Sequence, residues 1–225
     1  VVYLARRYFE LAKEVMDILL GVVLLALVLP VIAMCALLIR ISSPGPVIFR
    51  QMRLGKDGKP FWMYKLRTMH PDAEKNQGAT WAARNDPRVI PACRWMRRSH
   101  LDELPQLVNV IKGDMSIVGP RPERPEIMSK LKHDYPNVDT RLSVKPGITG
   151  LAQIRGGYDT SIKNFSRKLD ADLEYIASRR WSLEFWILAK TVSPIEQPTG
   201  FLRTDFQEVC VSRTSPPMRG RLEVP

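Results

Sequence analysis

Residues 97–123 read RRSHLDELPQLVNVIKGDMSIVGPRPE, and this stretch contains the clearest helix signal outside the N-terminal region. Its apolar side chains recur with the spacing of one helix face: Leu104, Leu107, Val108 and Ile111. Pro105 is tolerated only in the first turn of a helix, because proline has no backbone N–H. The helix is therefore predicted to begin close to Asp102, with Asp102 as a candidate N-cap and Gly113 just beyond its end.

Two adjacent carboxylates, Asp102 and Glu103, lie at the predicted start of this helix. The backbone N–H groups and the macrodipole at a helix N-terminus favour anions. Arg97 precedes the pair, and Arg121 follows it between two prolines that fix its backbone, as a phosphate clamp requires. An aspartate before a helix is usually only a cap, so the pair by itself leaves a structural and a catalytic interpretation open.

The segment from Ser99 to Pro122 closely resembles the signature of bacterial sugar transferases, the monotopic polyprenyl-phosphate phosphoglycosyl transferases. The resemblance extends from about residue 13 to about residue 192. It implies an enzyme that transfers a sugar 1-phosphate from a UDP-sugar to polyprenyl (undecaprenyl) phosphate and releases UMP. Such a reaction is the first membrane step of exopolysaccharide, capsule, O-antigen or glycoprotein glycan synthesis. The implied location is the cytoplasmic face of the bacterial inner membrane.

The resemblance assigns the role of nucleophile to the first acid of the pair, and the chemistry of the transfer suggests roles for the residues around it. Asp102 is expected to attack phosphorus and form a covalent phosphosugar intermediate in a ping-pong reaction. Glu103 is expected to assist proton transfer or to position the acceptor. Arg97 and Arg121 are expected to bind phosphate oxygens, since guanidinium does so bidentately. Mg²⁺ is the expected cofactor, held by substrate phosphates and few protein oxygens, with Asp102 as its candidate ligand.

Residues 18–39 form an uncharged apolar segment that is long enough to span a bilayer. Pro30 lies inside the segment and is expected to kink it. Positive charges flank it on both sides, at Arg6, Arg7 and Lys13 before it and at Arg40, Arg50 and Arg53 after it. The positive-inside rule then places both flanks in the cytoplasm. We therefore expect a re-entrant helix with its membrane kink at Pro30; a straight span with an incidental proline is the alternative.

A β-hairpin is predicted over residues 47–66, where two alternating segments flank the turn at Gly55–Gly58. Its basic residues outnumber its one acid, Asp57, and they are Arg50, Arg53, Lys56, Lys59, Lys65 and, directly after it, Arg67. One interpretation is a basic face on anionic lipid headgroups. The other is that Lys65 and Arg67 project into the active site as substrate-binding residues, because the segment YKLRTM resembles a short basic motif of the family.

Two further segments carry predictions. Residues 144–153 read VKPGITGLAQ and resemble the family's second signature, KPGITG. We expect a tight loop whose backbone N–H groups face a phosphate or a base, with Lys145 binding substrate. Residues 126–135 and 165–189 are predicted to be helical. The aromatic residues at 181, 185 and 186 suit a membrane interface, with an ordinary core stripe as the alternative.

Composition limits the class of protein. The chain has 225 residues and a net charge of +11, which suggests a polyanionic partner such as nucleic acid, anionic lipid or a nucleotide. Its three cysteines, Cys35, Cys93 and Cys210, suit neither a disulfide framework nor a zinc site. A reducing, cytoplasmic-side location is therefore the default expectation.

These features together predict an α+β, mainly helical fold with a re-entrant N-terminal membrane helix, a small basic β-hairpin and amphipathic interfacial helices. The expected domains are residues 1–40, the N-terminal helix and re-entrant membrane segment; 41–193, a compact cytoplasmic-face catalytic domain; and 194–225, a linker-like or disordered tail. Because the chain starts at Val1 rather than Met, we expect a fragment of a longer protein.

The expected partners are a UDP-sugar, polyprenyl (undecaprenyl) phosphate and membrane lipids, with no nucleic acid. The oligomeric state stays open, with a dimer as one alternative. Two other functional classes also stay open. One is a membrane-tethered basic module that stacks nucleic acid on Phe61, Trp62 and Tyr64. The other is a phosphohydrolase that uses Asp102 with water as the acceptor. The sequence does not specify the sugar.

Overall fold

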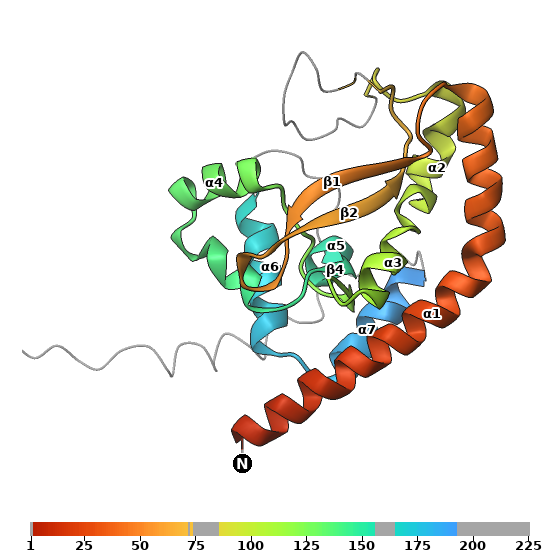
Figure 1. Ribbon diagram of the computed structural model, residues 1–225. Helices are drawn as coiled ribbons and strands as arrows, with labels where there is room; N and C mark the ends of the chain where they lie inside the picture. The colour runs from red at the N-terminus through yellow and green to blue at the C-terminus, as the bar shows by residue number, and fades with distance from the viewer. Residues whose placement is uncertain (1, 72, 74–85, 156–164, 193–225) are drawn as a thin grey trace, which may run out of the picture. The chain divides into compact units, whose positions relative to one another are not determined.

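The computed structural model describes residues 2–71, 73, 86–155 and 165–192. The predicted tail and most of the loop before Asp86 lie outside these residues. Over the described residues the protein is mainly helical, as the sequence predicts, with two small sheets, of which the sequence predicted only the hairpin. Its elements (Figure 1) are α1 (Val2–Ser42), β1 (Ile48–Leu54), β2 (Pro60–Leu66), α2 (Arg94–Arg98), α3 (Gln106–Ile111), β3 (Ser116–Val118), α4 (Pro125–Asp134), β4 (Gly147–Thr149), α5 (Leu151–Arg155), α6 (Phe165–Ala177) and α7 (Trp181–Val192).

The N-terminal segment is one long helix, α1, of 41 residues with Pro30 inside it. Proline donates no backbone hydrogen bond and is a common cause of kinks, and α1 is visibly bent in Figure 1. In the part of the chain that the structure describes, Arg6–Ser42 is the one helix long and apolar enough to cross a membrane, and an 18-residue window within it has a mean hydropathy of 3.2. That finding concerns length and composition, and it does not decide between re-entry and a straight span.

Both halves of α1 pack against the rest of the molecule. In the first half, a Cβ added to Gly21 would lie 3.3 Å from Cγ1 of Val110 on α3, so glycine allows a close approach there. Beyond Pro30, Cys35 and Ile39 are fully buried in a cluster with residues of the segment 90–96. The opposite face of α1 exposes apolar side chains along its whole length, at Leu4, Tyr8, Leu11, Val15, Leu19, Val22, Val23, Leu27, Leu29, Met34, Leu37 and Ile41.

Buried polar contacts fix the position of α1. Lys13 on α1 donates to Oε2 of Glu184 on α7 at 2.8 Å. One turn later, Asp17 accepts a 2.7 Å hydrogen bond from the hydroxyl of Ser116 in β3. Buried ionic groups tolerate little displacement, because a separated partner is left as an uncompensated charge. Helix α1 is therefore held in one register against β3 and α7.

The strands β1 and β2 form an antiparallel hairpin with a register from Ile48 opposite Leu66 to Leu54 opposite Pro60. The hairpin is attached to α3 through the amide of Asn109, which is fully buried. This amide donates to the carbonyl of Trp62 at 2.7 Å and accepts from the N–H of Tyr64 at 3.1 Å. The side-chain amide of Asn109 thus bonds the backbone of β2 as a neighbouring strand would. This contact holds the end of β2 beside the residues that precede α3.

The KPGITG segment is used differently from the prediction. Gly147–Thr149 form strand β4, which pairs in parallel with β3, so the predicted phosphate-facing loop is wrong for these residues. The N–H of Gly147 donates to the carbonyl of Pro120 at 2.9 Å. A Cβ at Gly147 would lie 2.1 Å from the N of Gly119. The glycines are needed because the two backbones approach too closely for a side chain.

Candidate active site

The acid pair lies in a short turn ahead of α3. His100 adopts a left-handed conformation (φ 57°, ψ 16°), and Leu101–Glu103 then form one turn of 3₁₀-helix. The α-helix itself begins at Gln106, after Pro105, and neither turn has a side-chain cap. The prediction that Asp102 is an N-cap is therefore wrong, because the left-handed residue starts the helical turn before Asp102. The prediction for Gly113 is confirmed: it follows the last turn with φ 80°.

Glu103 is the anchored member of the acid pair. Arg121, in the loop after β3, donates to it twice, from Nη1 to Oε2 at 3.0 Å and from Nη2 to Oε1 at 2.5 Å. Lys65, near the end of β2, donates to Oε1 at 2.6 Å. Burial alone raises the pKa of Glu103, but the charges and hydrogen bonds of Arg121 and Lys65 together hold it well below its usual range. Glu103 is therefore ionised and fixed in place.

Asp102 is equally buried but unpaired. It is 6% exposed, against 9% for Glu103. It accepts no hydrogen bond and forms no ion pair with any residue that the structure describes. Burial is the largest influence on its pKa and raises it, the charge of Lys65 opposes that rise, and the net shift is upward. Asp102 is thus the carboxylate with both oxygens available for chemistry.

The structure brings Lys65 and Arg121 to the acid pair. Arg97, at the end of α2, lies close enough for its charge to lower the pKa of Asp102. Strand β2, the loop after β3 and helix α2 therefore each bring one cation to the same two carboxylates. The resulting cluster holds three cations and two acids, so it carries a net positive charge that suits a phosphate-bearing ligand.

Two other predicted substrate-binding residues make different contacts. Arg67 is buried and donates to the backbone carbonyls of Pro44 at 2.6 Å and Ser43 at 2.8 Å, so it fixes the turn after α1. Lys145 donates to Oε1 of Glu14 on α1 at 2.5 Å. The contacts of both residues serve the attachment of α1, and neither engages the acid pair.

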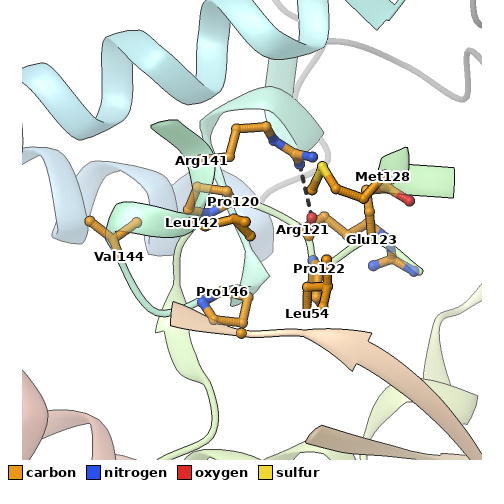
Figure 2. Close-up of a pocket in the computed structure, with 11 residues that line it drawn as sticks. Leu54, Pro120, Arg121, Pro122, Glu123, Met128, Arg141, Leu142, Val144 and Pro146 are labelled. Atoms are coloured by element: carbon orange, nitrogen blue, oxygen red, sulfur yellow. Dashed lines mark hydrogen bonds between the residues drawn. The ribbon is translucent and has the colours of Figure 1, made fainter. Parts of the chain in front are cut away.

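Two buried or half-buried guanidinium groups hold the loop that carries Arg121. Arg141 points toward this loop in Figure 2 and donates to the carbonyl of Arg121 at 2.9 Å. Arg53 on β1 donates to the carbonyl of the next residue, Pro122, at 2.9 Å. A pocket is lined by the loop together with Leu54, Gly55, Met128, Leu142, Val144 and Pro146. Arg121 lines that pocket, whereas Asp102 and Glu103 do not.

Acidic side chains pair with the two arginines, Arg141 and Arg53, that hold this loop. Arg141 forms a fully buried pair with Asp172 on α6, with Nε to Oδ2 at 2.7 Å. Glu123 accepts from Lys168 at 2.6 Å and lies 3.8 Å from Arg53. Burial lowers the pKa of Arg53 to about 10, and the charge of Glu123 opposes that fall. The loop backbone is thus fixed by charged groups from β1, α6 and the segment 136–143.

Sequence reasoning did not identify Asn109, Arg53 or Arg141 as contributors to the site. Asn109 is a polar residue inside a short apolar helix, and such a residue is a candidate for a buried hydrogen-bonding role. For Arg53 and Arg141 no local signal was available, because both act on backbone carbonyls of a segment that is remote in sequence.

The arrangement does not favour a nucleic-acid platform on the hairpin. Phe61 is buried in the core, and Tyr64 is half-buried with Lys112 5.4 Å from its ring centre. Of these three aromatic side chains only Trp62 is exposed. Base stacking by successive aromatic residues requires several exposed ring faces. These three residues offer one, and the other exposed ring of the hairpin, Phe49, lies on β1.

Comparisons with known proteins identify the family of the chain. The bacterial sugar transferase family model matches residues 8–197. The UDP-glucose:undecaprenyl-phosphate glucose-1-phosphate transferase of Escherichia coli (strain K12) is 45% identical over 178 residues, 78% of this chain and 38% of the relative. The UDP-N-acetylgalactosamine-undecaprenyl-phosphate N-acetylgalactosaminephosphotransferase of Aeromonas hydrophila is 38% identical over 193 residues, 86% of this chain and 45% of the relative.

A third relative matches over almost its whole length. The exopolysaccharide production protein PSS of Rhizobium leguminosarum bv. phaseoli is 35% identical over 195 residues, which are 84% of this chain and 98% of the relative. The chain thus spans less than half of the Escherichia coli and Aeromonas relatives and nearly all of the Rhizobium one. The match to the family model covers most of the chain and includes the acid pair, Lys65 and Arg121. The chain therefore belongs to the bacterial sugar transferase family.

Proposed function

We propose that the protein transfers a sugar 1-phosphate from a UDP-sugar to undecaprenyl phosphate, giving undecaprenyl-diphosphate-sugar and UMP. The observation that carries this proposal is the contrast between the two adjacent carboxylates. Asp102 is buried and has no hydrogen-bond partner among the described residues, while Glu103 is held by Arg121 and Lys65. A free carboxylate in a net positive cluster is suited to attack a phosphoryl group. The names of the relatives support the two substrate classes.

In the first step, an oxygen of Asp102 bonds to the phosphorus that carries the sugar. The bond from this phosphorus to the bridging oxygen of the diphosphate breaks, and UMP leaves with that oxygen and the electron pair. Repulsion between the anionic nucleophile and the diphosphate opposes this step. The cations Lys65, Arg97 and Arg121 reduce the repulsion, because they place positive charge where negative charge accumulates.

In the second step, a phosphate oxygen of the lipid attacks the same phosphorus, and the carboxylate of Asp102 leaves. The lipid phosphate is already ionised near neutral pH, so a strong general base is not required. Glu103 accordingly acts as a positioning residue: its fixed negative charge orients Arg121 and Lys65 toward the substrates. Two displacements at one phosphorus make a ping-pong reaction.

The residues present fit a bound Mg²⁺. Within the described ranges no group of three or more His, Cys, Asp or Glu side chains gathers at one point. Mg²⁺ commonly takes one or two protein carboxylates and completes its ligands with water and substrate phosphates. Asp102 supplies one unpaired carboxylate, whereas both oxygens of Glu103 are engaged. When bound, the ion supplies charge neutralisation of the diphosphate and its leaving group.

The proposed location is the cytoplasmic face of the inner membrane, where the soluble donor and the lipid phosphate meet. The exposed apolar face of α1 supports membrane attachment. The name of the Rhizobium relative supports a place in exopolysaccharide synthesis. We accordingly assign the protein to the first membrane step of a surface-glycan pathway.

The test is a UMP-release assay with a panel of UDP-sugars, with and without undecaprenyl phosphate. A transferase releases UMP catalytically only with the lipid, and one sugar is preferred. A phosphohydrolase would turn over without lipid and yield free sugar phosphate. A sugar-radiolabelled donor should label the wild-type protein and leave Asp102→Asn unlabelled. Normal turnover by Asp102→Asn would remove Asp102 as the nucleophile.

A further inference from the structure

Gln106, the first residue of α3, carries a buried amide nitrogen that finds no acceptor among the described residues. The residue is 1% exposed, and its Nε2 donates to no acceptor among the residues that the structure describes. Buried side-chain donors are paired in the large majority of cases, so an unpaired donor requires an explanation. An amide that faces a ligand site gains its acceptor only when the ligand is bound.

The position of Gln106 relates it to the acid pair. Leu101–Glu103 form a helical turn, and Leu104 and Pro105 keep helical dihedral angles up to Gln106. Residues four apart lie above one another on a helix. Long side chains of a helix also lean back over the preceding turn. By this spacing Gln106 shares a helix face with the turn that carries Asp102.

The two unpaired groups are complementary to one kind of ligand. Asp102 is a carboxylate that neither donates nor receives a hydrogen bond within the described ranges, and Gln106 is a donor without an acceptor. A group placed between them must present an electrophilic centre to the carboxylate and an oxygen acceptor to the amide. A phosphoryl group presents both, because its phosphorus is electrophilic and its non-bridging oxygens accept hydrogen bonds.

We propose that Gln106 is a further substrate-binding residue of this site: its Nε2 donates to a non-bridging oxygen of the transferring phosphoryl group. This inference rests on the function proposed above. As the oxygen of Asp102 bonds to phosphorus and UMP departs with the bridging oxygen, charge builds on the non-bridging oxygens. A neutral, fixed donor stabilises that charge without giving up a proton. The same hydrogen bond then holds the covalent intermediate for the lipid phosphate.

The experiment compares wild type with Gln106→Met, which keeps the length of the side chain and removes the donor. Gln106→Leu replaces it if the methionine variant does not fold. The full chain is purified in detergent, and two quantities are measured: the denaturant midpoint of unfolding, and the rate at which a sugar-radiolabelled UDP-sugar labels the protein without lipid acceptor. We expect an unchanged or higher midpoint and labelling slower by roughly a hundredfold.

Labelling at the wild-type rate would overturn the inference. A lower midpoint together with slower labelling would also overturn it, because the amide would then have an internal partner. Asp102→Asn separates this failure from failure of the proposed function. If wild type is labelled and Asp102→Asn is not, the proposed function stands whatever Gln106→Met does. If no UDP-sugar labels wild type, the proposed function fails, and the inference about Gln106 fails with it.

Discussion

At the scale of single residues, the two adjacent acids have opposite effects on stability. The folded-state pKa of Asp102 is raised, so ionisation of Asp102 destabilises the folded protein as pH rises through that pKa. The folded-state pKa of Glu103 is lowered, so its stabilisation is present above the unfolded pKa and is lost as pH falls through the folded one. Nearby cations act on both neighbours, but among the described residues they donate hydrogen bonds only to Glu103, and this is why the two acids differ.

This contrast gives a prediction about two matched amide variants. At pH 7, Asp102→Asn should unfold at an equal or higher denaturant concentration than wild type. Glu103→Gln should lose about 2 kcal/mol, since it removes charged hydrogen bonds from Arg121 and Lys65. Both variants should lose activity. Chemical denaturation of the purified proteins measures the difference, and equal destabilisation by the two substitutions would contradict the assignment of paired and unpaired acids.

The raised pKa of Asp102 also predicts a pH profile. Only the ionised carboxylate attacks phosphorus, so the rate of labelling by a UDP-sugar should fall as pH drops through this pKa. The charge of Lys65 is the largest of those that lower the pKa of Asp102. Lys65→Met should therefore move the acid limb of the profile to higher pH. Lys112→Met, which removes a charge paired with Asp114, is the control and should keep the wild-type profile. If the acid limb of the Lys65→Met profile did not shift, that limb would not report the ionisation of Asp102.

At the scale of elements, the loop between β3 and α4 owes its shape to groups outside it. Prolines restrict its backbone locally, but its carbonyls at Arg121 and Pro122 are fixed by Arg141 and Arg53. Arg141 uses different nitrogens for Asp172 and for the loop. A lysine keeps the charge but lacks the planar fork that reaches both partners.

Arg141→Lys should accordingly impair catalysis through Arg121. We expect the free energy of unfolding to fall by about 1.5–3 kcal/mol, the value of a charged hydrogen bond. We also expect kcat to fall by about tenfold. Arg155→Lys is the control, because Arg155 forms a partly exposed pair with Glu174 that contributes at most about 1 kcal/mol. Kinetics and denaturation are measured for both variants. An unchanged kcat in Arg141→Lys would show that the function of Arg121 does not depend on the hydrogen bond from Arg141 to its carbonyl.

At the scale of the whole molecule, the attachment of α1 bears on its topology. A straight helix over residues 18–39 extends about 33 Å, enough to cross a hydrocarbon core of about 30 Å. Both halves of this helix, however, pack on the catalytic part, at Val110 and around Cys93. A straight span would carry those partners and the nearby arginines of α2 into hydrocarbon, at several kcal/mol for each charge. Re-entry, with α1 against one leaflet, avoids this cost.

The topology prediction uses single cysteines at two exposed positions, Arg6 and Lys56, in a chain without its native cysteines. Intact cells are treated with a membrane-impermeant maleimide and compared with lysed cells. Both positions should be protected until lysis, because both flanks of α1 are expected in the cytoplasm. Labelling of the cysteine at position 6 in intact cells, with position 56 protected, would establish a straight span. Activity of each variant serves as the control for folding.

The sequence by itself determined the features that depend on neighbouring residues. Helical spacing predicted α4, α6 and α7, and alternation around a glycine turn predicted the hairpin. The signature around Asp102 and Arg121 predicted the family. These features are local because side-chain periodicity and turn chemistry act over a few residues.

Only the tertiary structure decided what the individual charged groups do. Lys65 lies 38 residues from Glu103, and Arg121 lies 18 residues from it, yet both donate to that one carboxylate. Within the part of the chain that the structure describes, the same packing leaves Asp102 without a hydrogen-bond partner, and it directs Arg67 to the turn after α1. The reason is physical: a pKa, an ion pair or an unpaired donor depends on burial and on atoms within a few ångströms, and those atoms come from remote segments.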